Sequence, residues 1–234
     1  MATKKKKQKS EHELFESSEA IADRLSKSEQ WIEDHKVWVY SFLGIIALVV
    51  GGFLLYRNYM ASQNNLAQSE MFQAQYWFET DSLNLALNGD GNNYGFLDIV
   101  ENYGSTKAGN LANFYTGVCY MKQGDYNLAI DYLSDFSADD KLVQARAYAL
   151  IGDAYMEQSD YDQAVSFYDK AASHYPNQYF TPNYLMKQAL AYEKLSELQN
   201  AIGAYDKIIK DFPQSTATPN ARKHKSRVEG MASK

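Results

Sequence analysis

The stretch ALIGDAYMEQSDYDQAVSFY, residues 149–168, has two counterparts of equal length in this 234-residue chain, FYTGVCYMKQGDYNLAIDYL (114–133) and MKQALAYEKLSELQNAIGAY (186–205). In each stretch a small residue is followed three residues later by tyrosine, and nine residues beyond that by alanine. The aligned residues are Gly117, Tyr120 and Ala129; Gly152, Tyr155 and Ala164; and Ala189, Tyr192 and Ala201. The stretches begin 35 and then 37 residues apart, which is typical of a repeated helix-turn-helix unit. The pattern predicts an all-α solenoid.

These residues resemble the tetratricopeptide repeat. The resemblance implies three repeats within 107–216, at about 110–143, 145–178 and 182–215. It also implies a juxtamembrane helix and a degenerate first helical pair in 58–106, and a capping helix with a tail in 217–234. Prolines punctuate the pattern: Pro176 and Pro213 are expected to end second helices. Thr181 and Thr218, each followed by proline, are expected to be N-caps of the next helices.

A second decisive stretch, VWVYSFLGIIALVVGGFLLY (37–56), contains no charged residue. At about 1.5 Å per residue, a helix of this length spans about 30 Å of hydrocarbon, so we expect a transmembrane helix at 37–57. No glycine or proline occurs between 53 and 88, so this helix is expected to continue as far as the glycine-rich loop 88–95. Gly44, Ala47 and Gly51 form a small-residue stripe, which we interpret as a contact with another membrane helix. Alternatively, the two glycines reflect only the frequent use of glycine in membrane helices.

Basic residues set the expected orientation. Eight Lys or Arg residues precede the span, whereas Arg57 alone follows it before Lys107. The positive-inside rule therefore predicts a cytoplasmic N-terminus. Segment 1–36 reads as a lysine-rich tail followed by an amphipathic helix, whose apolar residues are Leu14, Ile21, Leu25, Trp31 and Ile32.

The composition argues against several functions. Residues 61–234 hold 14 Lys/Arg and 21 Asp/Glu, a net charge of −7, which disfavours nucleic acid as partner. The single cysteine, Cys119, allows no intramolecular disulfide. The four histidines lack metal-ligand spacing, and no nucleophile motif or phosphate loop occurs, so we expect no enzyme activity, no cofactor and no metal centre.

Loop 88–101 leaves two interpretations open. Asp90, Asn92, Gly95, Asp98 and Glu101 fall on positions of a calcium-loop template, but Tyr94 stands where the template has a further oxygen ligand. The alternative is a turn followed by a helix with an acidic face.

The resemblance also implies a ligand face on the first helix of each repeat. Chaperone-tail receptors of this family hold a terminal carboxylate with Lys and Asn, which are absent from the matching positions here. Those positions hold Phe114, Ala149 and Met186, and Val118, Asp153 and Leu190. Instead, the face carries a candidate groove for apolar partner or client segments, formed by Phe114, Val118, Met121, Met156 and Met186. Alternatively, a neighbouring helix covers these side chains.

The full layout resembles the bacterial ancillary Sec translocon subunit (YfgM-like) family. The resemblance implies a single-pass protein of the bacterial inner membrane, with its repeats in the periplasm. It implies two partners, the Sec translocon and a membrane-anchored periplasmic prolyl isomerase chaperone. Alternatives are a scaffold subunit of another envelope secretion or motility complex and an organelle import receptor with cytosolic repeats, which the charge bias disfavours.

Overall fold

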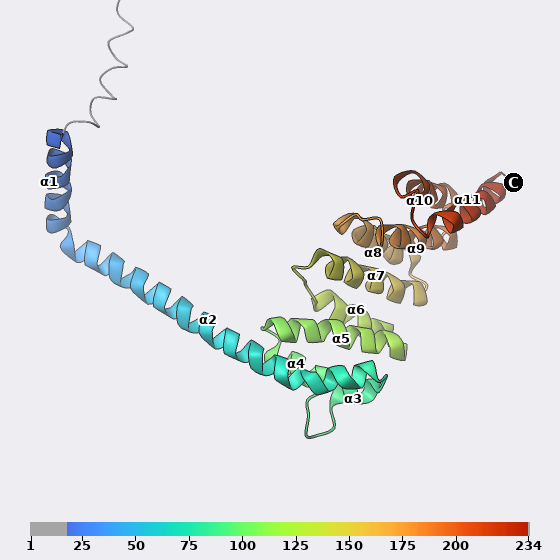
Figure 1. Ribbon diagram of the computed structural model, residues 1–234, viewed down its shortest axis with the longest axis horizontal. Coiled ribbons are helices and arrows are strands. Elements are labelled where there is room, and N and C mark those ends of the chain that lie inside the picture. The colour runs from blue at the N-terminus through green and yellow to red at the C-terminus, as the bar shows by residue number, and fades with distance from the viewer. Residues whose placement is uncertain (1–17, 234) are drawn as a thin grey trace, which may run out of the picture. The chain divides into compact units, whose positions relative to one another are not determined.

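The computed structural model describes residues 18–233, and all regular elements in this range are α-helices (Figure 1). The lysine-rich tail lies outside the described residues. So do Leu14 and the side chain of Ile21, two of the apolar residues of the predicted amphipathic helix. The chain divides into two compact units, Met1–Tyr59 and Met60–Lys234, which are described separately.

In the first unit, helix α1 (Ser18–Asp34) ends at a turn at His35, and α2 (Lys36–Glu79) begins directly after it. α2 contains a window with a mean hydropathy of 2.2 in which no residue is buried. Among the described residues it is the one helix long and apolar enough to cross a membrane. Trp38, Tyr40 and Tyr56 are exposed near the ends of this apolar segment, where amphipathic rings favour the headgroup layer.

Within the described residues, the second unit contains the C-terminal part of α2 and nine further helices (Figure 1). The later helices form antiparallel neighbours, α5 with α6, α7 with α8 and α9 with α10, and α11 packs on α10. The helices are α3 (Leu83–Asn88), α4 (Phe96–Tyr103), α5 (Lys107–Gln123), α6 (Tyr126–Asp135), α7 (Lys141–Glu157), α8 (Tyr161–His174), α9 (Thr181–Lys194), α10 (Leu198–Asp211) and α11 (Thr218–Ala232). The predicted all-α architecture is confirmed.

The expected helix from the span to loop 88–95 is interrupted earlier than the sequence indicated. α2 ends at Glu79, and Asp81 takes a left-handed conformation (φ 59°) before α3 begins at Leu83. Aspartate tolerates this conformation better than most residues, so a chain can turn there without glycine. The absence of glycine and proline was therefore not a sufficient sign of an unbroken helix.

An aromatic core joins the C-terminal part of α2 to the helices that follow it. Met71 and Trp77 of α2 pack with Leu87 of α3 and Phe96 of α4, all of them buried. Phe96 stacks on Tyr115 of α5, with ring centroids 5.0 Å apart. These contacts bury the leading helices against α5, as a solenoid end requires.

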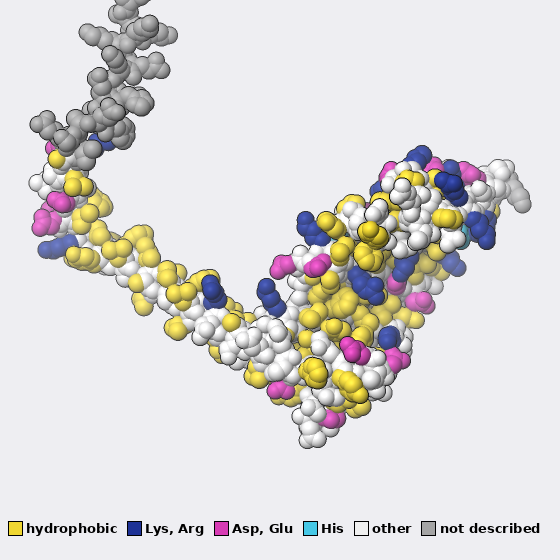
Figure 2. Space-filling model, in the orientation of Figure 1, with side chains coloured by type: hydrophobic (Ala, Val, Ile, Leu, Met, Phe, Trp, Pro, Cys, Tyr) yellow, Lys and Arg dark blue, Asp and Glu magenta, His cyan; other side chains and the backbone are white. Residues whose placement is uncertain are grey.

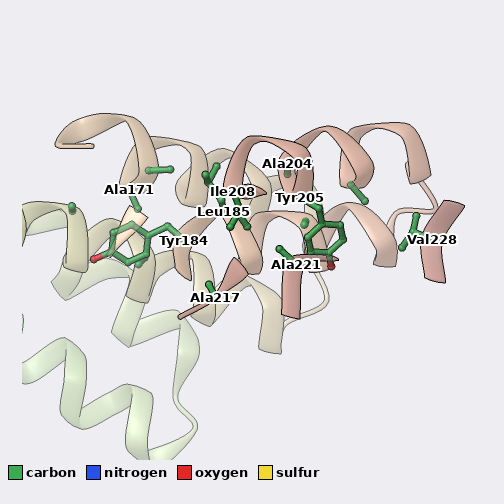
Figure 3. Packing of buried hydrophobic residues seen from close by; sticks show 14 residues of the cluster. Ala171, Tyr184, Leu185, Ala204, Tyr205, Ile208, Ala217, Ala221 and Val228 are labelled. Carbon is green, nitrogen blue, oxygen red and sulfur yellow. The ribbon is translucent and has the colours of Figure 1, made fainter. Parts of the chain in front are cut away.

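Small residues allow the helices of one pair to approach closely. A Cβ placed on Gly117 would lie 2.6 Å from Cγ of Leu133, and one on Gly152 would lie 2.7 Å from Cε1 of Tyr168. Further along, alanines from α8, α10 and α11 surround Tyr184, Leu185 and Tyr205 in one continuous core (Figure 3). Alternation of small and large side chains fills this core.

The predicted N-caps are wrong by one residue. Phe180 and Ala217 occupy the N-cap positions of α9 and α11, and the threonines that follow are the first helical residues. Both threonine hydroxyls bond to the preceding turn instead: Thr181 Oγ1 accepts from the Asn177 amide (2.9 Å), and Thr218 Oγ1 donates to the Phe212 carbonyl (2.7 Å). They therefore fix the inter-repeat loops rather than satisfying the first amides of the helices.

Candidate interaction surface

The five candidate groove residues are all half-buried. Met121 of α5 and Met156 of α7 line one hollow of about 370 Å³, and Leu190 of α9 forms its third apolar wall. Met186 of α9 lines a second hollow of about 430 Å³, together with Asn183 and with residues of α11 and the loop before it. The structure thus places two of the five residues in one hollow and a third in another.

Phe114 serves packing more than the predicted groove. Its ring lies 5.1 Å from that of Phe136, a residue only 5% exposed at the end of α6. Val118 follows one turn later on α5 and is half-buried. The apolar part of the surface is therefore centred on Met121 and Met156.

A polar network forms the floor of the first hollow. The Tyr168 hydroxyl donates to Asp153 Oδ1 (2.7 Å), and Lys187 Nζ lies 2.7 and 2.6 Å from the two carboxylate oxygens. Burial, followed by the charge of Asp153, raises the pKa of Tyr168, so its hydroxyl remains a donor. The network joins helices α7, α8 and α9.

Lys187 connects the two hollows, because it lines both of them. The two hollows lie on one face of the repeats, which is formed by side chains of α5, α7, α9 and α11. Residues at helical spacing from Asp153 on α7 and from Lys187 on α9 extend this face along the helices. We call this the odd-helix face. Figure 2 shows hydrophobic side chains gathered over the middle of the second unit, with Lys, Arg, Asp and Glu side chains around them.

A model of the tetratricopeptide repeat family matches residues 117–179 and, in an overlapping match, 150–216. This match decides the nature of the repeated unit. The chain contains tetratricopeptide repeats. They comprise α5 from Gly117 onward and helices α6 to α10.

Solved tetratricopeptide-type structures have the same fold. Two crystal structures of nearly identical TPR-like repeats, from a Podosopora anserina protein assigned as a kinesin light chain, each superpose with a TM-score of 0.54. They share 12% and 11% sequence identity with this chain, cover 71% of it in both cases, and are themselves covered over 85% and 86% of their length. No curated protein sequence matches this chain. At such identity the likeness concerns the fold, and tetratricopeptide repeats are scaffolds for protein–protein interaction.

The polar network recurs between the next tetratricopeptide repeat and the cap. Tyr205 donates to Glu193 Oε1 (2.7 Å), and Arg227 of α11 lies 2.6 Å from Oε2 of the same carboxylate. Each network joins both helices of one repeat to the first helix of the next. The first repeat holds Leu133 where the others hold Tyr168 and Tyr205, and its α5 carries Val118 where α7 carries Asp153.

Sequence reasoning missed these networks and Leu190 as a wall of the hollow. A signal was available. Asp153 and Lys187 are 34 residues apart, as are Glu193 and Arg227. Opposite charges one repeat period apart lie on neighbouring first helices and can meet there.

Of the other candidate sites, the small-residue stripe of α2 is open: a Cβ on Gly44 or Gly51 would have nothing within 4 Å. In loop 88–101 the carboxylates serve local turns. Asp90 accepts from the amides of Asn92 and Asn93, and Asp98 accepts from that of Gly95. Within residues 18–233 no three His, Cys, Asp or Glu side chains gather as metal ligands.

Proposed function

We propose that this protein is a membrane-anchored accessory subunit of the bacterial Sec translocon, which binds partner or client polypeptides on the periplasmic side. The observation that carries the proposal is the combination of one apolar helix in α2 with tetratricopeptide repeats whose odd-helix face holds a hollow walled by Met121, Met156 and Leu190. A repeat scaffold tethered to a membrane suits recruitment of proteins that emerge there. The translocon and a membrane-anchored periplasmic prolyl isomerase chaperone are the proposed partners.

The proposed location is the bacterial inner membrane, with a cytoplasmic N-terminus. The bias of eight basic residues before the span and one directly after it supports this orientation. The test uses cysteine labelling of intact cells in a Cys119→Ser background. Cysteine at Ser10 should resist an impermeant thiol reagent, whereas cysteine at exposed Asn220 should react once the outer barrier is opened. The reverse pattern would exclude a periplasmic function.

The proposed binding surface is tested by crosslinking in cells. A photoreactive residue in place of Met156, which lines the first hollow, should crosslink to a translocon subunit, to the isomerase or to a protein being secreted. The matched control is the same residue in place of exposed Lys207, which lies on the second helix of its repeat. Equal crosslinking from both positions would refute this surface. Crosslinks only to subunits of another envelope complex would replace the translocon proposal with the scaffold function.

A further inference from the structure

The C-terminal part of α2 meets the repeats at one edge of the second unit. The amide of Ala108, at the beginning of α5, donates to Asn64 Oδ1 (2.9 Å). Lys122, near the end of α5, pairs with Asp81, which follows α2 (2.7 Å). Helix α2 therefore runs in the same direction as α5. Asn64 follows Arg57, the last residue of the expected span, by seven residues, or about 10 Å of helix, whereas the end of α2 lies about 33 Å beyond Arg57.

The loops before the later first helices lie at the same edge as the beginning of α5. Ser137, in the loop before α7, exchanges two hydrogen bonds with the side chain of Asn110 on α5. Lys141, the first residue of α7, has its Nζ 5.7 Å from the centre of the Tyr175 ring in the loop before α9. The loop before α11 lines a hollow together with Asn183, near the beginning of α9. Successive loops are thus in contact with the beginnings of successive first helices.

The connections of the second unit fall on two edges. The proximal edge comprises the loops before α5, α7, α9 and α11, residues 104–106, 136–140, 175–180 and 212–217. The distal edge comprises the turns after α2, α5, α7 and α9, residues 80–82, 124–125, 158–160 and 195–197. The proximal edge is the one beside Asn64, where the chain arrives from the span.

The two edges differ in chemistry. Every distal turn contains an exposed carboxylate, namely Asp81, Asp125, Asp160 and Glu197. On the proximal edge, no charged residue occurs from 175 to 186 or from 212 to 221. Within the four proximal loops or next to them are four acidic and two basic residues, a net charge of −2 with His174 neutral: Asp135, Asp139, Asp140 and Asp211, and Lys107 and Lys141. This edge is therefore not a basic surface.

Loop 175–180 presents three aromatic side chains to solvent. Tyr175 is 45% exposed, Tyr179 72% and Phe180 45%. Asn177 folds the loop on itself, because its Oδ1 accepts from the amides of Tyr179 (3.0 Å) and Phe180 (2.8 Å). Its own amide donates to Thr181 Oγ1 (2.9 Å). The loop is thus fixed by its own hydrogen bonds with the rings outside the core, and a cluster of exposed apolar side chains marks a contact with another surface.

We propose that loop 175–180 docks in the headgroup layer of the membrane that holds α2, with Tyr179 and Phe180 as its anchors. The proposal rests on the proposed function in that α2 crosses a membrane. The headgroup layer is about 5–8 Å thick on each side of a bilayer. An edge that begins about 10 Å beyond the span is close to this layer, whereas an edge about 33 Å beyond it is not. The proximal edge therefore faces the bilayer.

The chemistry of the loop fits a lipid surface. An amphipathic tyrosine ring favours the headgroup layer, and an apolar ring is stabilised at its boundary with the acyl chains. The anchor also keeps the loop at a high local concentration beside the bilayer, so that a few side chains suffice for docking. Because the proximal edge carries a net charge of −2, anionic lipid should not strengthen the contact.

The test places a spin label on the full chain in nanodiscs of phosphatidylcholine, in a Cys119→Ser background. Two exposed glutamines carry the label in turn. Gln178→Cys lies in the docking loop and keeps its three aromatic residues, and Gln199→Cys follows the distal turn 195–197. Electron paramagnetic resonance measures how often each label collides with a water-soluble nickel chelate and with oxygen, which partitions into lipid. The label at residue 178 should meet the chelate several-fold less often, and oxygen more often, than the label at residue 199.

Variants assign this protection to the aromatic rings. Tyr179→Ser/Phe180→Ser should raise the collision rate of the label at residue 178 with the chelate to that at residue 199. The control is Leu85→Ser/Leu128→Ser, which removes two leucines, 41% and 42% exposed, that follow distal turns. This control should leave the protection unchanged. Circular dichroism checks that both variants keep the helical content of the parent, and addition of phosphatidylglycerol should not increase the protection.

Three results would overturn the docking while leaving the anchor and the translocon proposal in place. One is equal accessibility of the two labels in the parent chain. Another is protection that survives Tyr179→Ser/Phe180→Ser, since the tether alone would then account for it. The third is a loop that is exposed in nanodiscs but crosslinks to a protein in cells from a photoreactive residue at position 178, which would assign the surface to a protein partner. A chain that fails to insert into nanodiscs would instead overturn the anchor, and the docking with it.

Discussion

Gly152→Ala is the sharpest test of how the tetratricopeptide repeats are packed. The new methyl group would lie 2.7 Å from Cε1 and 2.8 Å from Cδ1 of Tyr168. That ring is only 2% exposed, and its hydroxyl is held by Asp153, so it has little freedom to move away. Gly203, on α10, is the matched control, because a Cβ there would have nothing within 4 Å.

The two substitutions should have opposite effects on stability. Replacing glycine by alanine inside a helix favours folding by about 1 kcal/mol, and Gly203→Ala should show this gain. In Gly152→Ala the same gain is opposed by overpacking, which costs about 1–3 kcal/mol in a well-packed core. In the third repeat, Ala189 stands at the position of Gly152 and Tyr205 at the position of Tyr168, so the fold has a geometry that accepts this methyl group. The overpacking cost of Gly152→Ala should therefore lie in the lower half of that range. We expect Gly152→Ala to be destabilised by up to about 1 kcal/mol.

The assay is urea unfolding of the full chain in lipid nanodiscs, followed by circular dichroism at the helical band. Stabilities of the two variants should differ by about 1–2 kcal/mol, or several degrees in melting temperature for a domain of this size. Should Gly152→Ala be stabilised as much as Gly203→Ala, the close approach of α7 and α8 would not constrain residue 152. The small residue of the repeat would then need another explanation.

Three further variants or conditions extend these arguments. Burial raises the pKa of Cys119 to about 12, so this thiol should resist alkylation at about pH 8 until denaturant opens the domain; rapid labelling of the native protein would contradict its burial. A hydrogen bond from Lys225 lowers the pKa of Asp206 in the folded protein, so the stability that the ionised carboxylate contributes is present above the unfolded pKa and is lost as the pH falls through the lowered pKa. Asp206→Asn should therefore melt below wild type at neutral pH and converge with it in acid, below that lowered pKa, whereas a constant difference would exclude this linkage. Gly44→Leu/Gly51→Leu should release a co-purifying membrane partner without preventing insertion, and undiminished recovery would leave α2 as a tether only.

The repeat could be recognised from the sequence because its signals are local. The small residue at Gly117 or Gly152 and the large residue sixteen positions later meet across one helix pair, so their spacing is fixed by the pair itself. The apolar span was equally readable, because partition into hydrocarbon depends on length and composition. The break at Asp81 was not readable, because a left-handed aspartate leaves no unique mark in a sequence.

The candidate surface was predicted less completely, for a physical reason. A half-buried methionine and an exposed one look alike in a helical pattern, and only neighbouring helices decide between them. Phe114 shows this, since its ring lies 5.1 Å from that of Phe136, the C-cap residue of α6. Met121 and Met156 came from the same pattern and do line a hollow.

The first hollow borders two joints between first helices, one with the polar network and one without it. Asp153 and Lys187 tie α7 to α9, and Glu193 and Arg227 tie α9 to α11. Between α5 and α7 no ion pair of this kind forms among the described residues, since α5 carries Val118 at the position of Asp153. An ion pair fills the space between two first helices with paired polar groups, whereas the flexible Met121 and Met156 line it with apolar surface that a ligand can displace or contact. The first hollow therefore combines apolar walls, where α5 meets α7 without a tie, with the Asp153–Lys187 pair on its floor, and a partner is expected to contact the methionines beside that pair.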